Sequence, residues 1–451
     1  MSSHAPTHHV ATRAAGRSTA TLSRAGRVFL AVFLIVAFEG AIRKWVASSS
    51  TLPLILLRDL LAVYLVLHAW RGGHLRRYPK VVTAMLAWTL LVIGWGLMQL
   101  VGGESSPTVF VIGLRFWLLY IWFAVAAAAA MTEADFNAAI RMAVLVMIVL
   151  APLAVLQHYS PPGAAINRQL DGDEDTVFVA IAGVVRTTGT FSFTSGYSAY
   201  LLLVAPAVFA LLGARKRTNI QRLFALTGFG AFIVGSVVSG SRAGVISAGV
   251  MLGAYLIARL VFARTRDKPA ALGAALVAAV LAAGFLFFFS DAILVTQQRF
   301  EQAASDEDFW ERLLATFIGE PRVLAQTTWL GKGLGAGSNL AASLYHGGAN
   351  FALAESETGR IVLEGGLLGF AFVALKLAVL VGGLAYALRL SILRHTAFPM
   401  VLWIAVVVGL MTWPAIGQLT ANALLGVLLG YFLLLFRYPS GDFFSTRSSS
   451  P

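Results

Sequence analysis

Four arginines stand near the ends of long hydrophobic segments, where a charged side chain needs an explanation. Arg58 and Arg115 lie about two helical turns inside such segments, and Arg186 and Arg242 lie in the polar stretches between them. Ionisable groups at membrane depth are costly and are candidates for function by default. Guanidinium groups bind phosphate oxygens through paired hydrogen bonds, so several arginines at one depth indicate a site for a multiply charged anion such as a diphosphate.

The same charges have a structural alternative. Glu39 and Arg43 are spaced to pair on one helical face, and Arg58 would pair with Asp59 or with another helix. The other basic side chains would contact lipid phosphates, and Lys376 would extend along its helix to the cytoplasmic surface. Both interpretations stay open for any single residue, whereas the whole set favours an anion site.

The composition requires that these residues be positioned by a membrane bundle. Hydrophobic residues make up 58% of the 451 positions and charged residues 12%, values outside the range of soluble domains. Windows of the roughly 20 apolar residues that a spanning helix needs recur along the chain, as at 28–46, 271–289 and 416–436. The alternation of a barrel is absent. We therefore expect an all-α, polytopic membrane helical bundle with about 12 transmembrane helices.

The hydrophobic windows divide the chain into one membrane domain and two tails. Residues 1–27 would form a disordered, basic cytoplasmic tail, residues 28–436 a single transmembrane domain, and residues 437–451 a second cytoplasmic tail. The predicted spans are 28–47, 52–70, 81–101, 108–130, 138–157, 196–213, 222–239, 243–262, 270–290, 361–386, 398–413 and 416–436.

The charge distribution sets the expected topology. A net charge of +13 would suit either an acidic partner such as nucleic acid or the excess of basic residues in cytoplasmic loops. Most of the 34 Lys and Arg residues fall on one side of the predicted bundle, and most of the 21 Asp and Glu residues fall on the other. This asymmetry favours cytoplasmic termini and argues against a nucleic-acid partner.

Two long outer segments, about 157–195 and 291–359, separate predicted spans. Long ordered loops are usually functional. In the second, the apolar residues of 309–318 share one helical face, which predicts a short helix. That helix would lie on the outer membrane surface or pack on the bundle, and the sequence favours neither alternative.

Other motifs do not indicate a cofactor. The chain has no cysteine, which excludes disulfide and thiolate chemistry. The acidic stretch 171–175 resembles the start of a calcium loop, but Thr176 occupies the place of the turn glycine. The glycine-rich stretch 331–337 lacks the Lys-Ser/Thr of a nucleotide-binding loop and is interpreted as a flexible turn. We expect no metal, nucleotide or other cofactor.

Four short motifs follow one another between roughly residues 180 and 370. They are Arg186-Thr-Thr-Gly-Thr-Phe191, Ser239-Gly-Ser-Arg242-Ala-Gly244, Trp329-Leu-Gly-Lys-Gly-Leu-Gly335 and Glu355-Ser-Glu-Thr-Gly-Arg-Ile-Val-Leu-Glu364-Gly-Gly-Leu-Leu-Gly369. In their order and spacing they resemble the O-antigen ligase and polymerase superfamily, membrane enzymes that join or transfer lipid-linked polysaccharide repeats outside the cell membrane. Phe38-Glu-Gly-Ala-Ile-Arg-Lys-Trp45 with Leu57-Arg-Asp59 is similar to a subgroup associated with exopolysaccharide synthesis.

The resemblance implies a glycosyltransferase on the outer face of a bacterial inner membrane. Its donor would be a glycan on a polyprenyl diphosphate, attacked at the anomeric carbon by a hydroxyl of an acceptor sugar. Ligases of the superfamily usually carry a His-Asn pair where this chain has Glu355-Ser356, which favours a polymerase. The implied partners are the lipid-linked glycan, membrane lipid and a chain-length regulator.

The resemblance also assigns roles. The catalytic base would be Glu355, with His346 as the second choice, because both precede the tenth span. The residues expected to bind the diphosphate are Arg186, Arg242, Arg115 and Arg312.

Two other functions stay open. A ligase would hand finished glycan to lipid A core or to protein, and sequence separates it poorly from a polymerase. A non-catalytic transporter or flippase of lipid-linked glycan would show polar groups along a path at the membrane midplane, whereas the charges here gather towards the outer end.

Overall fold

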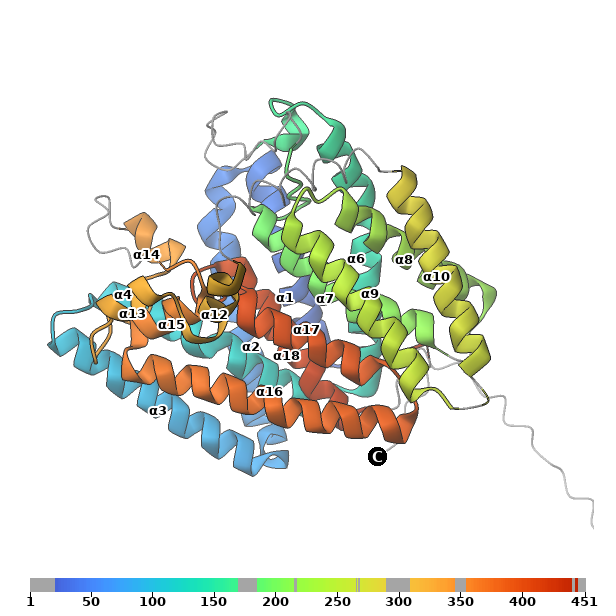
Figure 1. Cartoon of the computed structure of the whole chain (residues 1–451). Coiled ribbons are helices and arrows are strands. Elements are labelled where there is room, and N and C mark those ends of the chain that lie inside the picture. Colours follow the sequence, from blue (N-terminus) through green and yellow to red (C-terminus); the bar gives the residue numbers. More distant parts are fainter. Residues whose placement is uncertain are drawn as a thin grey trace, which may run out of the picture.

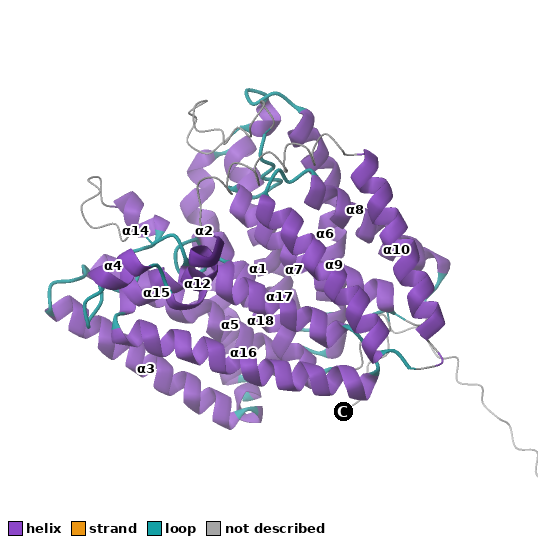
Figure 2. Ribbon diagram, viewed as in Figure 1, coloured by secondary structure: helices purple, strands orange, loops and turns teal. Residues whose placement is uncertain are grey.

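The protein is a bundle of long helices, described here from a computed structural model (Figure 1). The structure describes residues 21–168, 185–214, 217–264, 266, 268–288, 309–344, 354–439 and 443–444. Within these ranges the chain is helical almost throughout and forms no β-strand (Figure 2). This confirms the expected all-α architecture.

Ten helices in the described ranges are long and apolar enough to cross a membrane. They are α1 with the π-helical turn η1 (Arg24–Ala41 and Ile42–Val46), η2 with α2 (Ser48–Ser50 and Thr51–Arg71), α3 (Pro79–Val101), the unit of α4, η4 and α5 (Pro107–Leu114, Arg115–Leu119 and Tyr120–Ala130), α6 (Glu133–Tyr159), α7 (Thr194–Gly213), α8 (Asn219–Val237), α9 (Arg242–Phe262), α16 (Leu367–Arg394) and α18 (Leu419–Arg437). Two shorter apolar stretches, Ala275–Gly284 of α10 (Lys268–Phe288) and α17 (Phe398–Thr412), correspond to the remaining predicted spans. The protein is therefore a multi-pass membrane protein.

Smaller elements complete the description: the turns η3 (His74–Arg77) and η5 (Ala165–Asn167), and the short helices α12 (Phe309–Ile318), α13 (Pro321–Gln326), α14 (Asn339–Leu344) and α15 (Glu357–Gly365). Helices α12 to α15 gather at one side of the bundle in Figure 1.

Local sequence explains where several helices begin. Thr132 caps α6 by accepting a hydrogen bond from the amide of Asp135, whose side chain accepts from the Thr132 amide in return. Thr218 and Gln221 form the same reciprocal arrangement at α8. Proline is the first residue of α3 and of α4, where its missing N–H costs nothing.

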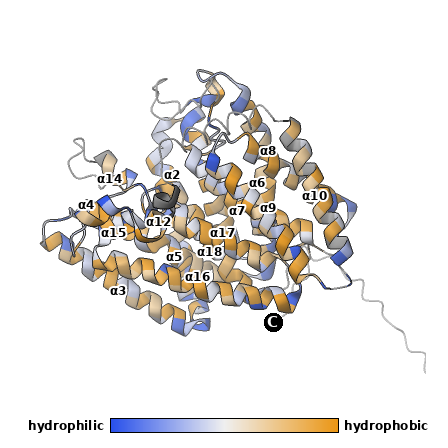
Figure 3. Ribbon diagram, in the orientation of Figure 1, coloured by the Kyte–Doolittle hydropathy of each residue, from blue (hydrophilic) through white to orange (hydrophobic). Residues whose placement is uncertain are grey.

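Small residues and aromatic rings fill the centre of the bundle. The rings of Phe29 and Phe123 stack at a centroid distance of 5.3 Å, with Tyr431 of α18 beside them. A Cβ atom at Gly426 would lie 2.8 Å from the Tyr120 side chain, so glycine there allows α18 and α5 to approach closely. Helices α3, α9 and α16 expose leucine and valine side chains, as expected of lipid-facing surfaces. Figure 3 shows that these helices consist mainly of hydrophobic residues.

The turns define two ends of the bundle. The basic end comprises the turns at 72–78, 131–132, 217–218, 263–264 and 395–397. The loop-rich end comprises the turns at 47–50, 102–106, 160–168, 185–193, 238–241 and 413–418, together with residues 309–344 and 354–366.

The tails and the short helices refine the predicted boundaries. α1 begins at Arg24, and Phe443 packs edge-on against Phe398 at 4.8 Å, so part of the C-terminal tail docks on the bundle.

α12 forms at residues 309–318 as predicted. Its Thr316 carbonyl accepts a hydrogen bond from Thr358, while Leu314 is 59% exposed. One side of α12 therefore packs on the protein and its apolar side faces outward.

The predicted tenth span, 361–386, is wrong at both ends. The chain breaks at Gly366, whose φ of 55° favours glycine and where a Cβ atom would lie 2.3 Å from the Trp329 carbonyl oxygen. Helix α15 therefore ends at Gly365, and α16 continues to Arg394.

Lys376 does not extend to the surface as predicted, because it lies in the first half of α16 and is only 6% exposed.

Candidate functional site

The segment before α7 and the turn before α9 pair through their backbones. The amide of Thr187 donates to the carbonyl oxygen of Ser239 at 3.2 Å, and the Thr187 hydroxyl donates to the carbonyl oxygen of Val238 at 2.7 Å. This pairing brings Arg186 and Arg242, two of the predicted diphosphate ligands, to the same place at the loop-rich end. We call these two residues the arginine pair.

The arginine pair is electrostatically suited to an anion. Burial lowers the pKa of the Arg186 guanidinium, and the positive charge of Arg242 lowers it further. Arg186 Nε is buried and has no hydrogen-bond partner within the described part of the chain. Arg242 is the first residue of α9, where unpaired amides and the helix dipole favour negative charge. A bound anion would offset the repulsion between the two cations.

Two basic residues of η1 hold residues 186–192, here named the arginine segment. Lys44 is 3% exposed, and its ammonium group donates to the Thr188 hydroxyl and to the Gly189 carbonyl oxygen, each at 2.8 Å. Arg43 donates to the Ser192 hydroxyl at 3.0 Å. The end of the first span therefore positions the arginine segment.

Helices α6 and α1 also form hydrogen bonds with the arginine segment. The Gln157 side chain accepts a hydrogen bond from the Gly189 amide at 2.7 Å and donates to the Ile166 carbonyl at 3.0 Å. The Thr190 hydroxyl donates to the Ala37 carbonyl oxygen. Residues 187–192 are therefore fixed at several backbone and side-chain positions, which is the rigidity that a preorganised anion site requires.

A buried charge network lies below the arginine segment. Arg58 of α2 is fully buried and donates to both carboxylate oxygens of Glu39 at 2.7 Å. Arg115 of η4 binds Asp59 through two hydrogen bonds of 2.6 and 3.1 Å, and Tyr120 donates to the same carboxylate at 2.9 Å. Glu39, Arg58, Asp59 and Arg115 constitute the buried charge network, whose formal charges sum to zero.

The network settles several predicted pairings. Glu39 does not pair with Arg43 as the helical spacing suggested, because its carboxylate is bound to Arg58. Arg58 pairs across helices, and its contact with Asp59 is a longer 3.6 Å. The predicted diphosphate ligand Arg115 has its charge matched by Asp59, and the structure does not bring it into contact with the arginine pair among the described residues. Its role in binding the diphosphate stays a prediction.

The other predicted site residues occupy the region before α16. Arg312 belongs to α12, but its side chain is outside the described part of the structure. His346 lies outside the described residues, as does the acidic stretch 171–175. Glu355 is exposed at the loop-rich end, directly before Ser356, which caps α15. Glu355 as the base stays a prediction.

Glu364 and Gln99 organise the stretch 331–337, here named the glycine loop. The Glu364 carboxylate is fully buried and accepts hydrogen bonds from the amides of Gly335 and Gly337, at 3.0 and 2.9 Å, and from the Trp117 indole at 3.0 Å. Gln99 accepts from the Leu334 amide at 2.9 Å. Burial raises the pKa of Glu364 to about 7. The glycine loop is thus an anchored turn.

Helix α15 contributes further charged groups that the sequence interpretation did not single out. Glu357 is buried and accepts from the Ile416 amide at 2.9 Å. Burial raises the pKa of Glu357, whereas the nearby charges of Lys376 and Arg360 lower it. Arg360 donates to the Ala354 carbonyl at 3.0 Å, and its Nε and Nη1 atoms are buried without a hydrogen-bond partner among the described residues.

The turn at 413–418 connects the two halves of the loop-rich end. The Gly417 carbonyl accepts from the Asn339 amide at 2.9 Å, just after the glycine loop. Its neighbour Gln418 accepts from the Ser195 hydroxyl at 2.8 Å, just after the arginine segment. The turn at 413–418 therefore links the start of α7, just after the arginine segment, to the stretch that follows the glycine loop.

Some of these residues carried a signal in the sequence. Glu364 lies in the motif that runs from Glu355 to Gly369, and Lys44 lies in the motif that runs from Phe38 to Trp45. Neither motif indicates which backbone amides or carbonyls the side chain contacts. Gln157, Gln418 and Arg360 had no comparable signal, because their contacts depend on how the helices pack.

Comparisons with known proteins do not identify the chain. Within the described residues, no three His, Cys, Asp or Glu side chains group as a metal site would require. No protein-family model matches the chain, and no curated protein matches it in sequence.

Proposed function

We propose that the protein is a membrane glycosyltransferase that transfers or polymerises polyprenyl-diphosphate-linked oligosaccharide repeats in O-antigen or exopolysaccharide biosynthesis. The observation that carries the proposal is the arginine pair, in which two cations on separate segments are held together by the contact between Thr187 and Ser239. The motif resemblance supports the same function, because both arginines belong to the motifs that carry it.

The proposed reaction exchanges a glycosyl phosphate bond of the donor for a new glycosidic bond. A hydroxyl of the acceptor sugar attacks the anomeric carbon of the donor, the bond from that carbon to the diphosphate oxygen breaks, and the diphosphate leaves on its polyprenyl chain. Arg186 and Arg242 stabilise the charge of the departing diphosphate. Glu355 accepts the hydroxyl proton, with His346 as the second candidate for this role.

The two ends of the bundle support a membrane placement for the proposed enzyme. The basic end would face the cytoplasm, since basic loops are retained there. The loop-rich end would then face the periplasmic side of a bacterial inner membrane, where the donor lipid's diphosphate lies at the outer leaflet. The departing diphosphate supplies the driving force, which suits a compartment without ATP.

A polymerase is favoured over a ligase because Glu355-Ser356 replaces the His-Asn pair that ligases of the superfamily usually carry. The test is to delete the gene in its host and to analyse the glycans attached to polyprenyl diphosphate. We expect single repeat units to accumulate, and wild-type protein to restore polymer. Long polymer retained on the carrier lipid would indicate a ligase instead, and an unchanged glycan profile would contradict both.

Point variants locate the chemistry in the same assay. Arg242→Ala should fail to restore polymer, whereas Arg264→Ala should restore it, because Arg264 is an exposed arginine at the basic end, beyond the other end of α9. Both variants must reach the membrane at wild-type level. Equal restoration by both would remove the arginine pair from the proposed site.

A further inference from the structure

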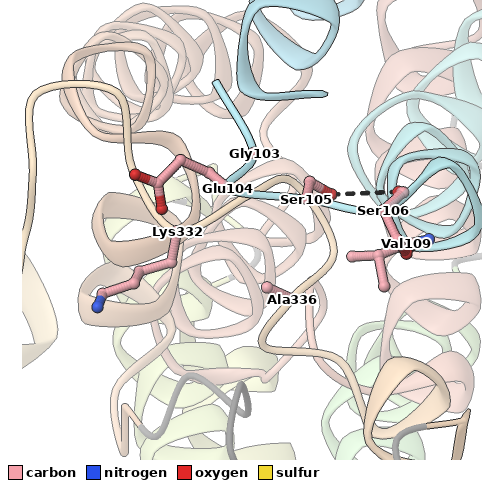
Figure 4. A pocket seen from close by; sticks show the side chains of 7 residues that line it. All are labelled: Gly103, Glu104, Ser105, Ser106, Val109, Lys332 and Ala336. Carbon is pink, nitrogen blue, oxygen red and sulfur yellow. Dashed lines mark hydrogen bonds between the residues drawn. The ribbon is translucent and has the colours of Figure 1, made fainter. Parts of the chain in front are cut away.

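A polar cavity of about 220 Å³ opens at the loop-rich end (Figure 4), and neither residue of the arginine pair lines it. Its walls come from two segments, the turn between α3 and α4 and the glycine loop. Glu104, Ser105 and Ser106 belong to the turn, and Lys332 and Ala336 belong to the glycine loop. Val109 of α4 adds an apolar side chain.

The lining suits a neutral, hydroxyl-rich ligand. The Glu104 carboxylate accepts hydrogen bonds, the Lys332 ammonium group donates them, and the serine hydroxyls do both. Glu104 and Lys332 form no ion pair within 4 Å in the described structure, although both line the cavity. One negative and one positive group together disfavour a multiply charged anion, in contrast to the arginine pair.

The walls are fixed before any ligand arrives. Gln99 donates to the carbonyl oxygens of Leu330 and Glu364, at 2.7 and 2.8 Å. A Cβ atom at Gly333, whose φ is 107°, would lie 2.9 Å from the Ser105 side chain, so the two walls are in direct contact. Rigid walls reduce the ordering cost of binding.

The size of the cavity limits the ligand. Pockets for drug-sized ligands measure roughly 300–1,000 Å³, so a cavity of about 220 Å³ accommodates one small polar unit rather than a chain. We propose that this cavity binds a single sugar residue of the glycan, remote from the bond that reacts. The inference rests on the proposed glycosyltransferase function, which supplies the glycan.

The position of the cavity explains how such a subsite would act. Asn339, three residues after Ala336 of its wall, bonds to Gly417 of the turn at 413–418, and Gln418 of that turn bonds to Ser195 at the start of α7, nine residues after Arg186. In the proposed arrangement a distal sugar of the glycan occupies the cavity while its diphosphate or acceptor end lies at the arginines, and these linked segments keep the two sites at a fixed separation. Such remote contacts contribute binding energy, so the loss should fall mainly on KM.

The first test measures transfer by the purified full-length protein in liposomes that contain lipid-linked repeats. Glu104→Ala and Lys332→Met should each raise KM about tenfold, as expected when one hydrogen bond to a ligand is lost, with kcat within about twofold of wild type. Ala336→Phe, which fills the cavity, should raise KM at least as much. Lys80→Met is the matched control, because Lys80 is exposed at the basic end.

The second test does not depend on catalysis. The probe is the oligosaccharide released by mild acid from the lipid-linked repeats, and calorimetry measures its binding to each variant. Wild type and Lys80→Met should bind it, and Ala336→Phe should not. If wild type elongates glycan but the cavity variants keep wild-type KM and bind the probe, only the subsite is refuted. If wild type does not elongate glycan, the proposed function fails with it.

Discussion

The amide of Thr187 donates a 3.2 Å hydrogen bond to the carbonyl oxygen of Ser239, and this contact joins two segments that are 52 residues apart in the sequence. Because Arg186 and Arg242 flank it, the contact brings together two cations that repel each other and so creates a site of concentrated positive charge. The repulsion is tolerated because each segment is fixed independently, by Lys44 and Gln157 on one side and by α9 on the other.

Removing either arginine should lower kcat rather than affect folding. Arg186→Ala and Arg242→Ala should each reduce kcat by about 10²- to 10³-fold, the usual loss for one donor to a developing negative charge. Since both would bind one diphosphate, the double variant should lose less than the product of the two single losses. Steady-state rates of the four proteins form the measurement, and strictly multiplicative losses would contradict a shared ligand.

Lys44 should behave as a positioning residue. Lys44→Met removes two hydrogen bonds to the arginine segment, and displacement of reacting groups by about 1 Å can cost up to about 10²-fold in rate. We expect kcat to fall while KM changes little. Thr188→Val removes one partner of Lys44, so its effect should be smaller, and adding it to Lys44→Met should have little further effect. Full kcat in Lys44→Met would refute this role.

The ion pair between Glu39 and Arg58 should be coupled in stability. Without Arg58 the buried Glu39 carboxylate would lose its ion-pair partner, and without Glu39 the buried Arg58 guanidinium would keep only its longer 3.6 Å contact with Asp59. Glu39→Gln or Arg58→Met should therefore cost about 3–5 kcal/mol. The double variant Glu39→Gln/Arg58→Met should be more stable than the less stable single variant, because no charge is left unpaired. Unfolding by denaturant in detergent micelles measures these differences, and additive losses would show that the pair is not coupled.

Glu364 should make stability depend on pH. Burial raises its pKa from 4.5 to about 7, so the folded state binds this proton more tightly than the unfolded state. The stabilisation is complete below pH 4.5 and is lost as the pH rises through 7, a difference of about 3 kcal/mol.

The matching variant is Glu364→Gln, which does not titrate. We expect it to be less stable than wild type at pH 5, because its amide nitrogen accepts no hydrogen bond from the glycine loop. Its unfolding midpoint should change less between pH 5 and pH 8 than that of wild type. An equal pH dependence in both proteins would assign the titration to another group.

The helices could be predicted because apolar windows of spanning length have few alternatives in a membrane. The break at Gly366 could not, since two glycines inside an apolar run are compatible with a continuous helix. Only the carbonyl oxygen of Trp329, which lies where a side chain would be, reveals why the helix ends there.

The candidate site was predictable in part. Arg186 and Arg242 were expected on one side of the membrane, and the structure brings them together. The pairing of Glu39 with Arg43 failed for a local reason: residues 42–46 form a π-helical turn, which changes the spacing on which that prediction relied. The contact of Lys44 with Thr188 joins residues 144 apart, and no sequence period encodes such a distance.

The central claim is that the protein forms glycosidic bonds, and one measurement tests it most directly. Purified protein is placed in liposomes with lipid-linked repeats accessible to the loop-rich end, and the glycan length on each carrier lipid is measured over time. We expect progressively longer glycans, together with one released polyprenyl diphosphate for each glycosidic bond formed. Repeats that stay single while they cross to the other leaflet would contradict it and indicate a flippase.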